Sequence, residues 1–559
     1  MSRKILPVLL LGLITLLNAY QVDLVGDSPA STVFEVRFGT PMARYVQNDY
    51  WLLKMEGFGY TGEDFGPQLF GRNFQVAVPR DSDIEVLITA VEWSDWMAIT
   101  PAPNCPEVNI YGIMGHVDPY LYTQSSGATV ELNGRRIVRG VEIADVFVEP
   151  VQFDPENGVR FMRSLRVELR YAGGGASDCG QRLYHPTWEN FFRGTLVNPD
   201  AAIPRHRPEY LEWDPTDGAE ILAIVRPDFQ DELQDWIDWK LLMGFPVRVV
   251  TTTFTGTDTS SIKTYIQNAY DSWTLPPSFV MLVADADYIP VYQGSGGLMG
   301  DNHYGTVDGS DIFPDIFVSR ISVDYTADIE LLVRKHLNYE KQPDTTDDWY
   351  ARYVGIVNED DPEWDPLGPM DSSYLAAVTY GMTQCSLAGF TSHPLFRRAW
   401  GDNFWTVKPY VEAGLGLVQY RGQAYPDYYY DFGQHISTGG GLDTLDNGGK
   451  CPVNISISCG TGAFMSGDNR MCERSTRAGT VANPKGATCF VGQSLVSNYS
   501  RERSSLSKHV FEGLFEARLN EFAAAHLYGK NELYAEFGGS YQSRYEYLSA
   551  TALGSPDML

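Results

Sequence analysis

The sequence predicts an α/β protein whose mostly parallel sheet is flanked by helices and preceded by an all-β region. After residue 218, continuous apolar runs alternate with amphipathic stretches, as buried strands alternate with covering helices. Before residue 200, apolar and polar residues alternate between Gly and Pro turns, which is typical of antiparallel strands. The 559 residues are 43% hydrophobic and 13% aromatic, which excludes a mainly disordered chain.

The first residues predict export. Arg3 and Lys4 precede an apolar run over 5–17, which ends at Asn18 and Ala19. This pattern is typical of a secretory signal peptide, so we expect residues 1–19 to be removed and the protein to be secreted or on the cell surface. The run is shorter than the roughly 20 residues that span a bilayer, and no later segment is longer. We therefore expect no membrane span in the mature chain.

Residues 20–200 form the predicted β region. Ile84, Val86 and Ile88 alternate with polar residues, and so do Leu165 and Val167. The pattern favours an antiparallel sandwich or barrel. No nucleophile lies near a base in this region, which favours a structural domain or a pro-domain. The proline-rich stretch over 201–217 then predicts a linker.

Residues 218–559 form the predicted α/β domain. In open sheets of this kind, sites form beyond the carboxyl ends of the strands. The strands are expected at 221–225, 247–250, 279–283, 316–318, 353–357, 415–418 and 455–457.

The charge of the chain limits its partners. Asp and Glu number 71 against 42 Lys and Arg, for a net charge of −29, so nucleic acid is excluded as a partner. No cofactor is required by any motif. Two acidic clusters, Asp308 with Asp311 and Asp360 with Asp361, could hold structural calcium through carboxylate oxygens. A solvated acidic face is the alternative for both clusters.

Cys459 is the candidate nucleophile. An apolar strand delivers it to the carboxyl edge, and Gly460 follows, so that backbone N–H groups there could hold an oxyanion. The alternative is a buried or disulfide-bonded cysteine. The chain has seven cysteines, whose pairing cannot be read from the sequence.

An ordered series of motifs resembles the gingipain-like cysteine peptidases of the caspase-like clan. The motifs are Asp301-Asn302-His303-Tyr304, Pro314-Asp315-Ile316-Phe317-Val318-Ser319-Arg320-Ile321, Tyr420-Arg421-Gly422, Ser458-Cys459-Gly460-Thr461-Gly462, and Leu553-Gly554-Ser555-Pro556-Asp557-Met558. The amino-terminal region, with Gly66-Pro67-Gln68-Leu69 and Val76-Ala77-Val78-Pro79, is similar to the gingipain propeptide. The resemblance implies a caspase-like sheet and a propeptide, and we expect cleavage near 205–215, beside Arg205 and Arg207. An uncleaved, docked β domain is the alternative.

One position departs from the resembled pattern. The family places a histidine after the glycine that ends the base strand, but here Gln423 follows Gly422. A glutamine side chain cannot take the thiol proton. His435 could fold over the site from the next loop, and His303 lies on a loop expected at the same face. An ordinary surface or turn histidine is the alternative at both positions.

The resemblance implies a secreted cysteine endopeptidase that cleaves protein or peptide substrates. Cys459 would form a thioester, His435 would act as base, and the backbone of Gly422 and Gly460 would hold the oxyanion. The alternative is an inactive relative that serves as a surface binding or assembly module. A carbohydrate-binding or adhesive protein is a third class, favoured only by the aromatic content. The sequence leaves cleavage specificity and oligomeric state open.

Overall fold

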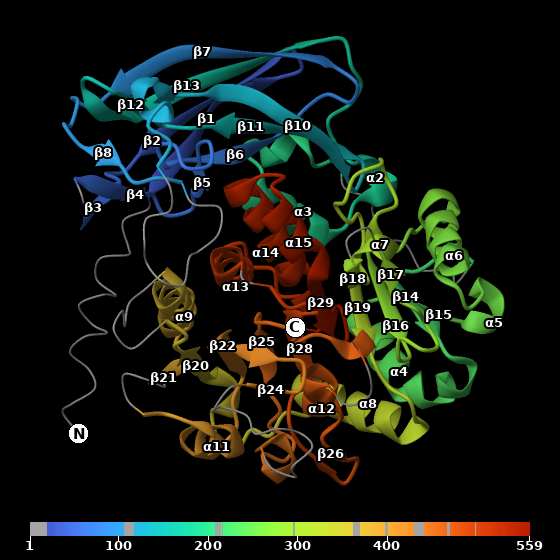
Figure 1. The fold of residues 1–559 in the computed structure, drawn as a ribbon. Coiled ribbons are helices and arrows are strands. Elements are labelled where there is room, and N and C mark those ends of the chain that lie inside the picture. Colours follow the sequence, from blue (N-terminus) through green and yellow to red (C-terminus); the bar gives the residue numbers. More distant parts are fainter. Residues whose placement is uncertain are drawn as a thin grey trace.

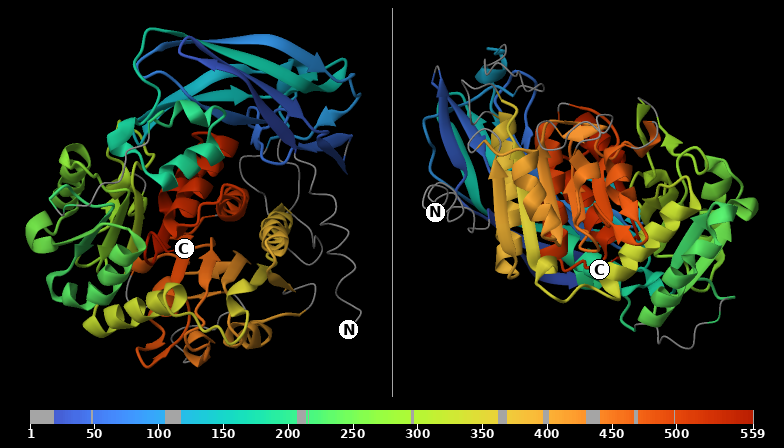
Figure 2. Two further views of the ribbon diagram at one scale, coloured as in Figure 1. Left: turned by 180° about the vertical axis from the view of Figure 1, so that it is seen from behind. Right: turned by 90° about the horizontal axis from the view of Figure 1, so that it is seen from below.

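The computed structural model describes residues 19–47, 49–104, 117–206, 214, 216–294, 297–361, 369–396, 401–429, 441–466, 470–497 and 499–558. In these ranges the chain forms an N-terminal β region and a larger α/β region that lie against each other (Figures 1 and 2). No described helix combines the length and the apolar composition needed to cross a bilayer.

Two sheets packed face to face make up most of the β region. Their strands are β1 (Tyr20–Ser28), β2 (Ser31–Phe38), β5 (Gly59–Thr61), β6 (Leu69–Ala77), β7 (Asp83–Trp93), β9 (Ser126–Gly127), β10 (Val130–Val138), β11 (Val141–Val148), β12 (Val151–Asp154) and β13 (Gly158–Ala172). One sheet has the order β1-β2-β13-β12-β9, with β7 also paired to β13, and the other has the order β10-β11-β6-β5. Side chains of both sheets share one apolar core, as in the predicted sandwich. A smaller sheet contains β3 (Met42–Gln47), β4 (Tyr50–Lys54) and β8 (Thr100–Pro101).

A ten-stranded sheet organises the α/β region. Its strands are β14 (Ile221–Val225), β15 (Val247–Thr251), β16 (Phe279–Val283), β19 (Phe317–Ile321), β20 (Arg352–Asn358), β21 (Thr391–Phe396), β22 (Leu417–Gly422), β25 (Val453–Ser456), β28 (Cys489–Gln493) and β29 (Ala550–Leu553). The order is β15-β14-β16-β19-β29-β28-β25-β22-β20-β21. All neighbours are parallel except β28 and β29, so the predicted mostly parallel sheet is confirmed.

The antiparallel pair β28–β29 divides this sheet into two parallel halves that run in opposite directions. The carboxyl ends of β22 and β25 therefore lie at the same edge as the amino ends of β19 and β29. Elements that precede β19 and β29 can thus contribute to a site beyond β22 and β25.

Helices cover both faces of the sheet (Figure 1). They are α4 (Gln234–Met243), α5 (Thr252–Thr255), α6 (Thr259–Ser272), α7 (Asn302–Gly305), α8 (Thr326–Glu340), α9 (Pro369–Leu387), α11 (Phe404–Glu412), α12 (Met471–Arg477), α13 (Ser500–Phe515), α14 (Phe522–Phe537) and α15 (Tyr541–Ser549). Helix α13 packs against α9 and α14, and α14 contacts both β19 and β6. The α13–α14 pair therefore lies between the sheet and the β region (Figure 2).

The β region ends earlier than the predicted boundary at residue 200. After β13 the chain forms α2 (Gly180–Leu183) and α3 (Pro186–Thr195). His185 caps α3 by accepting the Thr187 N–H, and Pro186 occupies the first helical position. The Trp188 ring stacks on Phe317 of β19 at 4.1 Å between centroids. These helices therefore pack into the core of the α/β region. Contacts with residues distant in the chain, and not the local sequence pattern, determine this placement.

Ion pairs join the two regions. The Arg72 guanidinium on β6 lies 3.0 Å from the Glu532 carboxylate on α14, and both side chains are 7% exposed. Arg72 also donates to the carbonyl of Gly57 and to the hydroxyl of Tyr20. Lys508 on α13 pairs with Glu56 at 2.7 Å, where the Glu56 side chain stays 52% exposed. The β region is thus docked through one buried ion pair and one at the surface.

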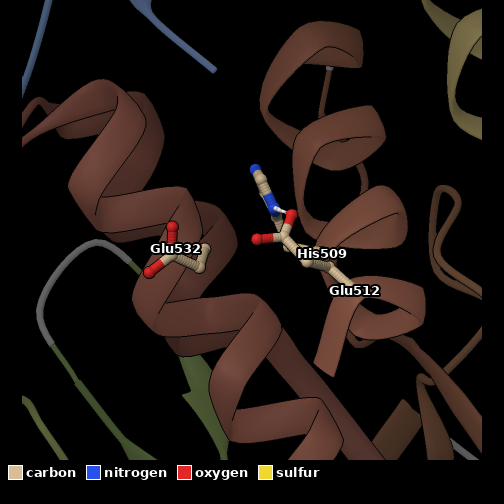
Figure 3. Close-up of side chains that lie close together, drawn as sticks. All are labelled: His509, Glu512 and Glu532. Carbon is tan, nitrogen blue, oxygen red and sulfur yellow. Dashed lines mark hydrogen bonds and ion pairs between the residues drawn. The ribbon is translucent and has the colours of Figure 1, made fainter. Parts of the chain in front are cut away.

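His509, Glu512 and Glu532 lie in this interface, with their ligand atoms within 4.8 Å of one another. Figure 3 shows His509 and Glu512 on one helix facing Glu532 on its neighbour. The His509 ring contacts Glu512 at 2.6 Å through Nδ1 and Glu536 at 3.3 Å through Nε2. Burial lowers the pKa of His509, but the two carboxylates outweigh this and raise it to about 9. The His509 imidazolium and Arg72 therefore supply positive charge beside these acids.

Replacing Arg72 with Met should destabilise the protein by about 3–5 kcal/mol, because Glu532 would stay buried without its partner. Urea unfolding followed by fluorescence measures this. Arg37 is the matched control, since its contacts with Asp23 and Glu35 are on the surface and its side chain is 54% exposed. Arg37→Met should cost about 0–1 kcal/mol. Equal effects of the two variants would contradict the buried-pair argument.

The His509 imidazolium should make stability fall in alkali. Its pKa is raised in the folded state, so its contribution is complete below the ordinary value of 6.5 and is lost as the pH rises through about 9. Melting temperatures measured from about pH 6 to about pH 10 should drop more steeply for the native protein than for His509→Gln. Parallel curves would show that the imidazolium does not stabilise the fold.

Candidate active site

Cys459 lies just beyond the carboxyl end of β25, as predicted. Thr461 holds the turn by donating its hydroxyl to the Ser458 carbonyl at 2.9 Å. Gly460 has φ +67, and a Cβ there would meet Pro426 at 2.8 Å, so only glycine fits. The Cys459 side chain is half-buried, and its sulfur contacts the Ser497 carbonyl at 3.2 Å. The thiol therefore faces a site and is not part of the core.

Gln423 shares a pocket with Cys459. It directly follows β22, which neighbours β25 in the sheet. The two residues line one pocket of about 570 Å³. Gly422 packs closely on Asn358, so that a Cβ at residue 422 would lie 2.4 Å from the Asn358 carbonyl oxygen. The Tyr420 hydroxyl donates to the Gln423 carbonyl at 2.5 Å. The structure thus places Gln423 beside Cys459.

Arg503 on α13 is the principal residue that sequence reasoning missed. Its Nη1 donates to the Cys459 sulfur at 2.6 Å, and its Nε donates to Glu546 at 2.9 Å. Burial opposes the charge of Arg503, but Glu546 and the Cys459 sulfur outweigh it and hold the pKa of Arg503 above its usual range. The guanidinium therefore places a permanent positive charge in direct contact with the Cys459 sulfur.

Arg421 lies beneath the pocket and joins three elements. Its guanidinium donates to the Ser504 hydroxyl and the Ser500 carbonyl of α13, and to the Ile457 carbonyl after β25. Burial lowers the pKa of Arg421 to about 10, with Tyr374 opposing the change. The side chain thereby fixes α13, and with it Arg503, relative to β22 and β25.

The predicted oxyanion donor Gly460 is already engaged. Its N–H donates to the Leu495 carbonyl at 3.0 Å, and the same carbonyl accepts from Arg503 Nη2 at 3.1 Å. Stabilisation of an oxyanion by Gly460 would require this bond to open. Gly422 lines the pocket, as expected of a residue at the base strand.

The two histidines predicted as substitutes for the base lie elsewhere. His435 falls outside the described residues. His303 lies on α7, where its ring stacks on Tyr292 at 4.0 Å, and it lines a neighbouring groove. Burial lowers the pKa of His303 to about 4, with help from Lys263. In this structure His303 and Cys459 do not share a pocket.

The acidic clusters make hydrogen bonds within the fold. Asp311 accepts the N–H groups of Ile137 and Phe313, and Asp308 pairs with Arg80 at 3.5 Å. Asp361 accepts the N–H of Asp371, while Asp360 lines the Cys459 pocket. These contacts give Asp311 and Asp361 a role in shaping loops. The calcium sites predicted there stay predictions.

The other described cysteines differ from Cys459. All six described cysteines are free, so Cys459 forms no disulfide with another described cysteine. The other five are buried, and burial raises the pKa of each. Cys459 is therefore the described thiol suited to react.

The ten-stranded α/β sheet shares the fold of the solved gingipain structures, which confirms the predicted fold class. The chain belongs to peptidase family C25, whose family model matches residues 214–558. The gingipain-like resemblance found in the sequence is therefore confirmed.

Similarity to individual relatives is distant. Gingipain R2 of Porphyromonas gingivalis is 21% identical over 403 residues, which cover 68% of this chain and 52% of that protein. Lys-gingipain of the same organism is 25% identical over 397 residues, covering 67% of this chain and 22% of that protein. The chain thus matches about half of the first relative's length and about a fifth of the second's.

Solved structures support the same fold. The crystal structure of the Arg-specific cysteine proteinase gingipain R has a TM-score of 0.55 at 18% identity, covering 63% of this chain and 80% of that chain. The complex of the pro- and mature domains of RgpB from Porphyromonas gingivalis has a TM-score of 0.55 at 18% identity, covering 61% and 79%.

Removing the guanidinium beside the thiol should slow alkylation. We expect Arg503→Met to lower the rate of iodoacetamide labelling of Cys459 at neutral pH at least about tenfold, because the thiolate loses its cation. Arg501→Met is the matched control on the same helix, since Arg501 lies over the Tyr60 ring, at 4.6 Å from its centroid. Peptide mass mapping must locate the label, because Cys105 lies outside the described residues. Equal rates in both variants would show that Arg503 does not activate the thiol.

Proposed function

We propose that this protein is a secreted or cell-surface cysteine endopeptidase with Cys459 as its nucleophile. The observation that carries the proposal is the Arg503 guanidinium 2.6 Å from the Cys459 sulfur, in a pocket at the carboxyl ends of β22 and β25. Membership in peptidase family C25 supports protein or peptide substrates.

The proposed reaction requires Cys459 as the nucleophile and a second group that donates a proton. The sulfur attacks the scissile carbonyl, the C–N bond breaks, and a thioester forms while the amine leaves. The amine nitrogen must receive a proton, and water then releases the acid from sulfur. Arg503 favours the thiolate but cannot exchange a proton near neutral pH. Arg503 therefore positions and stabilises the nucleophile without acting as the base.

His435 is the proposed acid and base. Gln423 occupies the family's base position and has no proton to exchange near neutrality. His303 is turned to Tyr292 in the neighbouring groove. His435 follows Gln423 by twelve positions in the sequence and is the remaining histidine that the sequence offers for this role.

A second candidate function is binding without turnover. Gln423 favours it, since the residue retains hydrogen-bonding groups in the pocket while removing the proton carrier of the base position. On this alternative the pocket would hold a peptide segment in a surface assembly.

The remaining features of the proposal concern maturation. Export is supported by the basic and apolar start of the sequence at 3–19. A propeptide role for the β region is supported by its docking on α13, the helix that carries Arg503. Arg205 is exposed in the linker, where we expect cleavage near 205–215.

Structural calcium at the acidic loops, held by Asp308 with Asp311 or by Asp360 with Asp361, is also part of the proposal.

Peptide cleavage tests the proposal against the alternative. We expect the native protein to cleave peptides from an unbiased library, read by mass spectrometry, and expect cleavage to vanish in Cys459→Ala and His435→Ala. His393→Ala is the matched control and should retain cleavage, since His393 lies on the edge strand β21 with its ring against Tyr410. Binding of peptides without cleavage, together with cleavage gained in Gln423→His, would instead establish the binding module. Cleavage that persists in Cys459→Ala would contradict both.

A further inference from the structure

A second groove adjoins the Cys459 pocket and has a volume of about 1190 Å³. One wall is the hairpin of β17 (Tyr292–Gln293) and β18 (Met299–Gly300) with α7, and the other wall is α15. Tyr292 and His303 present their stacked rings on the first wall, and Tyr541 and Tyr545 line the second. Tyr541 is 61% exposed and Tyr292 is 42% exposed. The groove is thus accessible and lined with aromatic rings.

A direct contact links the groove to the catalytic pocket. The Tyr545 hydroxyl donates at 3.2 Å to the carbonyl of Val496, a residue that lines the Cys459 pocket. The Tyr499 ring lies between the two, at 5.6 Å from Tyr545. Helix α15 also carries Glu546, which holds Arg503 against the sulfur. A chain extending from Cys459 across Tyr499 would therefore enter the groove.

Arg544 is the charged side chain of the groove that is available to a ligand. It is exposed on α15, lines the groove, and makes no ion pair within the described part of the chain. The acid of this groove, Asp311, points its oxygens to the N–H groups of Ile137 and Phe313. The Asp311 oxygens are thus engaged, whereas the Arg544 guanidinium can pair with a carboxylate of a ligand.

We propose that this groove binds the polypeptide substrate at a segment remote from the scissile bond, selecting a carboxylate side chain next to an aromatic one. Arg544 pairs with the carboxylate, and the rings of Tyr292, Tyr541 and Tyr545 pack on the aromatic side chain. The proposal rests on the proposed peptidase function, because it assigns the groove to the same substrate chain.

Binding measured on Cys459→Ala protein tests this site without requiring turnover. Fluorescein-labelled peptides from a library that varies acidic, basic and aromatic positions are titrated and followed by anisotropy. We expect the tightest peptides to carry an acidic residue beside an aromatic one. Adding Arg544→Glu should weaken the binding of these peptides about tenfold. Exchanging the peptide's acidic residue for Lys should restore binding to that variant. Tyr541→Ala should weaken the same peptides.

Arg518→Glu is the matched control, since Arg518 is an exposed arginine at the end of α13 opposite to Arg503 and makes no described ion pair. Unchanged binding in Arg544→Glu, an equal loss in Arg518→Glu, or binding of glycans in place of peptides would each overturn the proposal. Loss of binding in Arg544→Glu with no cleavage by the native protein would uphold the groove and refute the peptidase function. Cleavage with a raised KM for acidic peptides in Arg544→Glu would uphold both.

Discussion

The antiparallel pairing of β28 with β29 is the constraint on which the site depends. It reverses the direction of half the sheet, so that the amino end of β29 meets the carboxyl ends of β22 and β25 at one edge. The helix before β29 is α15, and it brings Glu546 against Arg503. In a fully parallel sheet that helix would lie at the opposite edge, and Arg503 would be a buried cation without its carboxylate.

Buried charges at the site are held by reciprocal contacts. Arg503 has Glu546, the Cys459 sulfur and two backbone carbonyls as partners, and Arg421 below it has serine hydroxyls and carbonyls. Because a guanidinium removed from water is costly unless it is hydrogen-bonded, each arginine requires this geometry. The same principle fixes Arg72 against Glu532 where the β region docks on α14. Rigidity of the pocket and docking of the β region therefore have a common physical origin.

The exchange at the base position separates two tasks that one histidine would combine. A histidine beside the thiol both stabilises the thiolate and moves the proton. Here the Arg503 guanidinium contacts the sulfur, and Gln423 in the same pocket has no proton to exchange near neutral pH. Under the proposed function, proton transfer therefore requires a histidine from another segment.

The sequence by itself determined the sheet class, the strand positions and the placement of Cys459 and Gln423, because these follow from local hydrophobic pattern and from residues that directly follow strands. It also identified the family through short motifs. Arg503 and Glu546 were not predicted, since they lie 44 and 87 positions from Cys459 and no local pattern distinguishes them from other charged residues on amphipathic helices. Tertiary structure likewise determined two further features: α3 packs into the core of the α/β region, and the His303 ring stacks on Tyr292. Burial and ring stacking depend on partners distant in the chain.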